Sequence, residues 1–240
     1  MLINEIEIQG ASFAFKCFQI NGAVEQIAKM IELRGDLCDI ETELPGFHDW
    51  DFEGVTIRGF YSVVVPFEVE HLIDGLTTKT LLKRLESCEF AITENMLITW
   101  GKSNAIKLMT AALSAVTGQH IDLIEFEFQQ LNQLQERMTR IKTVALINPK
   151  EKEVRRARLS GHMEGYTEYN VIDPRNHGIE TVSGMIDTPL GPLTITVGRM
   201  GAVRLNVKRG LIMTTECLEW ILALIKEEKL PEFEQPQSVF

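Results

Sequence analysis

The side chains most suited to chemistry are concentrated between Pro45 and Gly54. This stretch, PGFHDWDFEG, interleaves ionisable and aromatic side chains: His48, Asp49, Asp51 and Glu53, with Trp50 and Phe52. In an extended chain, alternation of side chains would place the three carboxylates on one side and the two aromatics on the other. Carboxylate oxygens bind hard cations such as Mg²⁺. One hypothesis is therefore a metal-dependent hydrolase or nuclease that uses Asp49, Asp51 and Glu53, with His48 or His71 nearby.

Two other interpretations of the same stretch involve no chemistry. It can be a solvated acidic loop that its aromatic side chains pin to the protein, and this interpretation is favoured because no second acidic cluster of equal density follows. It can also be a docking surface for a basic partner, including Arg156 and Arg158 of a second subunit. Glu68 and Glu70 beside His71 repeat the acidic spacing more sparsely.

Charge is segregated along an acidic chain whose formal net charge is −10. Seven acids and no bases lie between Asp36 and Glu53, whereas eight bases and two acids lie between Arg137 and Arg158. The predicted binding residues for nucleic acid or an acidic partner are the bases Arg137, Arg140, Lys142, Arg155, Arg156 and Arg158.

The geometry expected of this basic patch is a strand beside a helix. In a strand over VRRARLSGH, Arg156 and Arg158 share one face, and paired guanidinium groups bind phosphate or carboxylate through two hydrogen bonds each. A helix bearing Arg137 and Arg140 would extend the patch, as would Arg204 and Lys208 on a neighbouring strand. A solvated edge strand, protected from aggregation by its charges, is the competing interpretation. A small phosphorylated ligand is a third.

Motifs of the common enzyme classes are missing from the sequence. There is no P-loop, dinucleotide-binding glycine motif, nucleophile elbow, HExxH or EF-hand pattern, and the five histidines are isolated from one another. The four cysteines lie far apart without a C-x-x-C pair, which predicts reduced thiols. We therefore expect no cofactor, and a binding protein is favoured over an enzyme.

Hydrophobic periodicity predicts an α+β fold of antiparallel sheets with β-hairpin-helix units. One such unit is expected over 88–118, where Ile106, Met109, Leu113 and Val116 form an apolar helical stripe before Gly118. The second half is predicted to be mostly antiparallel β, closed by a C-terminal helix. Other expected elements are a short helix carrying Leu81, Leu82 and Leu85, a strand over 121–128, and a helix over 129–141.

Three segments are predicted along the chain. Residues 1–148 form an α+β domain, residues 149–230 form antiparallel β with the C-terminal helix, and residues 231–240 form a flexible tail. The first two segments can also be one continuous domain.

No apolar run approaches the length of a membrane span and the N-terminus lacks a signal-peptide pattern, so a cytoplasmic location and no membrane partner are expected. The predicted function is a non-enzymatic, self-associating, homo-oligomeric binding protein that contacts nucleic acid or an acidic partner. A metal-dependent hydrolase and a purely structural or inhibitory interaction protein are the alternatives.

Overall fold

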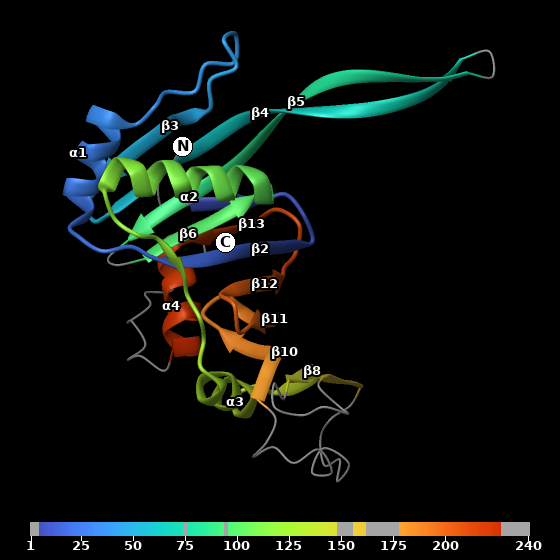
Figure 1. The fold of residues 1–240 in the computed structure, drawn as a ribbon. Coiled ribbons are helices and arrows are strands. Elements are labelled where there is room, and N and C mark those ends of the chain that lie inside the picture. Colours follow the sequence, from blue (N-terminus) through green and yellow to red (C-terminus); the bar gives the residue numbers. More distant parts are fainter. Residues whose placement is uncertain (1–4, 74–75, 94–95, 148–155, 162–177, 227–240) are drawn as a thin grey trace. The chain divides into compact units, whose positions relative to one another are not determined.

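The computed structural model describes residues 5–73, 76–93, 96–147, 156–161 and 178–226 (Figure 1). The chain forms two compact units: unit 1 contains Met1–Lys16 and Leu123–Phe240, and unit 2 contains Cys17–Asp122. The α+β class predicted from the sequence is confirmed, since the described residues form mostly antiparallel strands with four helices. None of the helices within these ranges is long and apolar enough to cross a membrane. The break predicted after residue 148 and the tail over 231–240 lie outside the described residues.

Unit 2 is built from two helices and a four-stranded run of antiparallel pairs. Its elements are α1 (Val24–Arg34), β3 (Gly46–Glu53), β4 (Thr56–Ile73), β5 (Leu76–Thr93), β6 (Met96–Gly101) and α2 (Ser103–Thr117). The strands are hydrogen-bonded in the order β3-β4-β5-β6. β2 (Ser12–Gln19) crosses from unit 1 into unit 2 after Lys16, and β7 (Asp122–Leu123) spans the second boundary.

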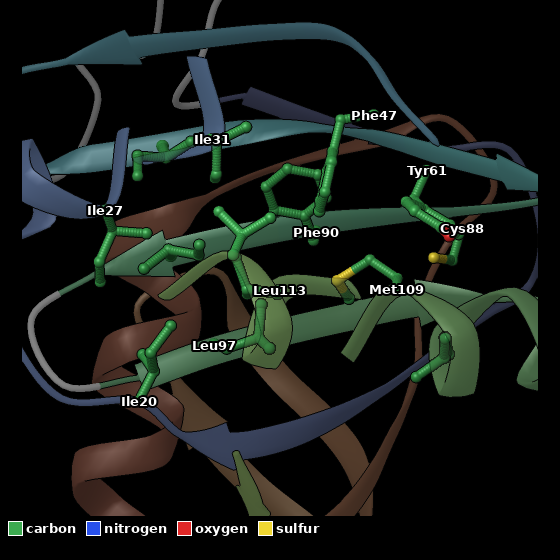
Figure 2. Packing of buried hydrophobic residues seen from close by; sticks show 14 of the residues in the cluster. Ile20, Ile27, Ile31, Phe47, Tyr61, Cys88, Phe90, Leu97, Met109 and Leu113 are labelled. Carbon is green, nitrogen blue, oxygen red and sulfur yellow. The ribbon is translucent and has the colours of Figure 1, made fainter. Parts of the chain in front are cut away.

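The core of unit 2 lies between the two helices and one face of this sheet (Figure 2). The apolar stripe of α2 is buried as its period-3.6 spacing predicts, and Gly118 ends the helix in the left-handed conformation at φ 68°. Phe47 of β3 contacts Tyr61 and Phe90 edge-on, with ring centroids 5.1 and 5.7 Å apart. Side chains of alternating residues on β3, β4 and β5 therefore face the helices, and the residues between them face away.

The short helix predicted around Leu81 is wrong, because this segment belongs to β5. β4 and β5 are each 18 residues long and pair along their whole lengths, from Ile57 with Ile92 to Ile73 with Leu76. The leucines that suggested a helix instead alternate along a strand whose cross-strand hydrogen bonds outweigh the intrinsic helix preference of leucine.

Unit 1 contains a larger antiparallel sheet and two helices. Its elements are β1 (Glu5–Ile8), the first part of β2, α3 (Phe128–Glu136), β8 (Arg140–Ile147), β9 (Arg156–Ser160), β10 (Gly178–Thr188), β11 (Gly191–Gly198), β12 (Ala202–Asn206), β13 (Leu211–Thr214) and α4 (Thr215–Lys226). The strands follow one another in the order β2-β12-β11-β10-β8-β9, while β1 pairs with β13 in a separate two-stranded sheet.

One face of the unit 1 sheet is apolar and buried, and α3 packs on β10 and α4. A continuous row across paired strands shows this face: Leu159, Val144, Val182, Val197, Val203 and Phe15. All but Leu159 are buried. Because side chains alternate along each strand, the residues between them project from the opposite face.

Two predictions around α3 are wrong. The strand expected over 121–128 is limited to Asp122–Leu123, and the helix expected over 129–141 ends at Glu136. Arg137 is the C-cap of α3 and Arg140 begins β8, so they do not share a helix face. The helix cannot continue because the strand β8 begins at Arg140, where Ile141 pairs with Gly184 of β10, and Met138 also lies against Gly184.

Candidate functional site

The solvent-facing side of the unit 1 sheet carries two rows of small and polar side chains with cations at or near their ends. The strand register places Arg158 of β9 at one end of the first row and Lys16 of β2 at the other. This row runs across six strands: Arg158, Ala145, Thr181, Gly198, Ala202 and Lys16. With about 4.8 Å between neighbouring strands, its end Cα atoms lie about 24 Å apart along the sheet.

The second row lies two residues along and is richer in hydroxyl groups. It contains Ser160, Thr143, Ser183, Thr196, Arg204 and Ala14. The Oγ of Ser183 and the Oγ1 of Thr196 are 2.8 Å apart, so neighbouring strands share a hydroxyl hydrogen bond on this face. We call these two rows, with the charged side chains that border them, the polar sheet face.

Two β-bulges place further charged side chains at the border of the polar sheet face. The β8–β10 register skips Lys142 on one strand and Glu180 on the other. Lys142 Nζ donates a hydrogen bond to Thr194 Oγ1 at 2.9 Å, and Arg156 pairs with Glu180 at 2.8 Å. A bulge adds one residue to a strand and redirects its side chain. The two bulges therefore direct the side chains of Lys142 and Glu180 to this face.

The polar sheet face has more positive than negative charge. Its bases are Lys16, Arg140, Lys142, Arg156, Arg158 and Arg204, and its acids are Glu180 and Asp187. Arg158 and Arg204 are exposed and make no ion pair with any residue in the described ranges. Two unneutralised guanidinium groups above a floor of small side chains can donate hydrogen bonds to phosphate or carboxylate oxygens.

The structure brings together most of the predicted basic residues that it describes. Lys142, Arg156 and Arg158 lie at the polar sheet face, and Arg140 pairs with Met185 at its border. Arg137 lies apart at the end of α3, and Arg155 is outside the described residues.

Sequence reasoning proposed Arg204 as an extension of the patch but missed Lys16. Only the register of β2 against β12 places Lys16 beside Ala202. Lys208 lies beyond the end of β12.

The acidic stretch that dominates the sequence is a strand, β3, so its interpretation as a loop is wrong. The β3–β4 register is interrupted between His48 and Asp51, and Asp49 has φ 45°, a conformation that few residues other than glycine adopt. The three carboxylates are exposed, while Trp50 and Phe52 pack against the core of unit 2. The expected pinning by the aromatics is present, but hydrogen bonding to β4 fixes the backbone as well.

The bulge aims Asp49 back at His48 and creates a chain of polar contacts across three strands. His48 Nδ1 lies 2.9 Å from Asp49 Oδ2, and His48 Nε2 lies 2.8 Å from Ser62 Oγ on β4. Ser62 Oγ is in turn 2.6 Å from Ser87 Oγ on β5. A neutral imidazole that donates to Asp49 and accepts from Ser62 satisfies both ring nitrogens.

This chain has the order of an Asp-His-Ser triad, but it does not present a nucleophile. Ser62 is only 1% exposed, so a substrate cannot reach its Oγ, whereas Asp49 at the other end is open to solvent. Sequence reasoning identified His48 and Asp49 but missed Ser62 and Ser87, which lie 14 and 39 residues downstream of His48. The hydrogen bonds fix the bulged strand to its neighbours.

The metal hypothesis for Asp49, Asp51 and Glu53 gains no support from the geometry. In the part of the chain that the structure describes, no group of three or more His, Cys, Asp or Glu side chains is arranged to hold a metal ion. Asp51 Oδ1 accepts a hydrogen bond from the Phe52 amide. Glu68 and Glu70, the second segment considered, both pair with Lys79.

The acids before β3 are also part of a folded turn. The two oxygens of Asp39 accept hydrogen bonds from the Thr42 hydroxyl and the Glu41 amide, at 2.6 and 2.9 Å. The bonds from Thr42 are the main cause that lowers the pKa of Asp39. Glu43 forms an ion pair with Lys83 of β5.

On the same side of the unit 2 sheet as His48, a buried cation is fully partnered. Arg58 is 4% exposed, and its Nε donates to Glu89 Oε1 at 2.6 Å. Trp100 Nε1 donates to the other Glu89 oxygen at 2.9 Å, and its ring lies 5.8 Å from the Arg58 guanidinium carbon. Each carboxylate oxygen therefore has its own donor, which is the condition for burying such a pair.

Comparison with known proteins supplies no family for this arrangement. No protein-family model matches the chain, and no curated protein matches it in sequence.

Proposed function

We propose that the protein binds nucleic acid through the polar sheet face of unit 1. The observation that carries the proposal is the pair Arg158 and Arg204, two exposed guanidinium groups without ion-pair partners among the described residues, on a face with several further bases. In a chain of net charge −10, such a concentration of positive charge favours contact with a polyanion.

The floor of the face favours contacts to the phosphate backbone. The small residues Gly, Ala, Ser and Thr let a nucleic-acid backbone approach closely, and the hydroxyl groups of Ser and Thr donate hydrogen bonds to phosphate oxygens. The two rows contain no aromatic side chain on which an unpaired base could stack. We therefore expect little sequence preference, and duplex DNA to bind at least as tightly as single strands.

The test is the salt dependence of binding to fluorescent duplex DNA, single-stranded DNA and RNA, measured by anisotropy between about 50 and 200 mM salt. Arg158→Glu/Arg204→Glu removes the two cations that have no ion-pair partner among the described residues. If each contacts one phosphate, the slope of log K against log salt falls by about 1.8 in magnitude.

The matched control is Lys29→Glu/Lys107→Glu, which makes the same change in net charge at two exposed helix positions of unit 2. The control should bind as the wild type does. Undetectable binding by the wild type, or equal losses in the two double variants, would contradict the proposal. Binding to an acidic polypeptide but to no nucleic acid would point instead to an acidic protein partner.

A further inference from the structure

The most unusual feature of unit 2 is the long part of its β4–β5 hairpin that leaves the sheet. β3 pairs with β4 only as far as Ser62, and β6 pairs with β5 only from Cys88 onward. Figure 1 shows the two strands continuing beyond the helices as a ribbon. We call Val63–Ile73 together with Leu76–Glu86 the β-arm; within the described residues its strands pair only with each other.

One face of the β-arm, the leucine face, exposes large apolar side chains. Leu72, Leu81 and Leu85 are 76%, 67% and 48% exposed. The cross-strand pairs of this face are Val64 with Leu85, Pro66 with Lys83, Glu68 with Leu81, Glu70 with Lys79 and Leu72 with Thr77. Lys83 lies between Leu85 and Leu81, and the Glu70–Lys79 pair separates Leu81 from Leu72. Isolated exposed leucines are common, but three on one face of a ribbon without a core, together with Val64 and Pro66, favour an interaction surface.

The other face of the β-arm continues the core-facing side of the unit 2 sheet. It begins at buried Val63 and carries Val65 and Phe67, with Leu82 opposite Phe67 and 42% exposed. The Arg84 guanidinium covers the Phe67 ring at 5.5 Å. This face is thus partly shielded within the chain, whereas the leucine face is not.

A two-stranded ribbon is at best marginally stable in water, so an arm of this length favours a bound state. Its edges are poor docking sites: Pro66 on β4 lacks the N–H that a further strand would need, and Lys79 and Lys83 place charges on β5. The leucine face is therefore the surface that gains most from a partner.

The charges of the leucine face indicate which partner fits. The acids Glu68 and Glu70 stand on β4, and the bases Lys79 and Lys83 stand on β5. Within one chain Lys79 pairs with both acids and Lys83 pairs with Glu43, so a partner must present opposite charges that replace the water around these pairs. A two-fold axis parallel to the arm lays β4 of one copy over β5 of another, which brings Glu70 opposite Lys79 of the second copy and covers the leucines. A polyanion on this face would be repelled by Glu68 and Glu70. A lipid surface would bury Lys79, Lys83 and the two acids without offering them opposite charges. Self-complementarity is the property that a symmetric dimer requires.

We propose that the protein forms a two-fold symmetric dimer in which the leucine faces of two β-arms pack against each other. The dimer is independent of nucleic-acid binding and uses residues of unit 2 only. It gives the self-association predicted from the sequence a specific surface.

The first test is the molar mass in solution, measured by size-exclusion chromatography with light scattering. The wild type should have twice the chain mass of 27.2 kDa, and Leu72→Ser/Leu81→Ser/Leu85→Ser should have the mass of one chain. The matched control Leu33→Ser/Leu37→Ser/Leu44→Ser changes three exposed leucines outside the arm and should remain dimeric. Circular dichroism verifies that both variants fold. A monomeric wild type, or a dimeric arm variant, would overturn the proposal.

The second test is a charge exchange followed by sedimentation equilibrium. Glu70→Lys alone and Lys79→Glu alone each place like charges opposite one another twice in the dimer, so each should weaken dimerisation about tenfold. Glu70 and Lys79 also pair within one chain, so the two single variants are mixed to isolate the contact between chains. In the mixed dimer opposite charges face each other across the axis while like charges remain within each chain, so the mixture should recover the wild-type dissociation constant. A mixture that associates as weakly as the single variants contradicts the proposed axis.

Discussion

Cations are placed in opposite ways on the faces that the strands of unit 1 and the strands of unit 2 turn away from their helices. In unit 2, Arg58 is buried and bound to Glu89. In unit 1, Arg158 and Arg204 stand exposed without ion pairs in the described residues. A cation whose hydrogen bonds are satisfied inside the chain stabilises the fold, and one that is left unpaired is available to a ligand.

The largest effect that tests this comparison is on the free energy of unfolding. Arg58→Ala leaves the Glu89 carboxylate nearly buried without its cation, so we expect a loss of about 3–5 kcal/mol. Arg204→Ala removes an exposed cation that has no ion pair with any described residue and should change stability by less than about 0.5 kcal/mol. Urea unfolding followed by circular dichroism measures both. Equal losses would mean that the two cations do not differ as described.

The next largest effect concerns two hydroxyl pairs, one in each unit. Ser62→Ala removes the buried link between His48 and Ser87 and should cost about 1–3 kcal/mol, because both partners lose a hydrogen bond. Ser183→Ala breaks a similar contact with Thr196 on the polar sheet face, where water can replace it, and should cost less than about 0.5 kcal/mol. Urea unfolding measures the free energy of unfolding of both variants. An equal loss for Ser183→Ala and Ser62→Ala would contradict the proposed difference between the two units.

The smallest expected effect concerns a property that the two units share, a buried thiol whose pKa is raised. Burial raises the pKa of Cys88 in unit 2 to about 12 and that of Cys217 in unit 1 to about 11. An unfolded thiol ionises near its ordinary pKa of 9.0, so each thiol's contribution to stability is complete below that pH and is lost as pH rises toward the folded pKa.

Above about pH 9, each buried thiol should lower the free energy of unfolding by about 1.4 kcal/mol per pH unit. Cys88→Ala and Cys217→Ala should each make the free energy of unfolding less dependent on pH between pH 9 and pH 10, by the amount that one thiol contributes. Urea unfolding at each pH measures this dependence. A slope that neither substitution changes would show that burial does not hold these thiols neutral.

Much of the fold follows from local patterns, and the failures have a common cause. Helix α2 was predicted from its apolar stripe and from Gly118, both of which act within one turn or one face of a helix. The segment around Leu81 was assigned to a helix because leucine favours helices and no neighbouring residue reveals the pairing with Glu68. Strand pairing depends on residues far away in the chain, which local propensity does not contain.

The candidate site was predicted in part for the same reason. Arg156 and Arg158 lie two residues apart, so a strand places them on one face whatever its neighbours are. Lys16 lies 142 residues before Arg158 and joins the same row only through five strand pairings. For the acidic stretch, the density of carboxylates suggested a metal site that the geometry does not support. The fold instead turns Asp49 toward His48.

The sequence by itself determined the α+β class, the segregation of charge and the alternation that packs Trp50 and Phe52 against the core while Asp51 and Glu53 stay exposed. These are properties of near neighbours and of composition. Tertiary structure decided which cations are neutralised, because ion pairs such as Arg58 with Glu89 join residues that are distant in the chain. It also decided that the Leu81 segment lies in an unsupported ribbon, since a strand is left without neighbours only where the rest of the sheet ends.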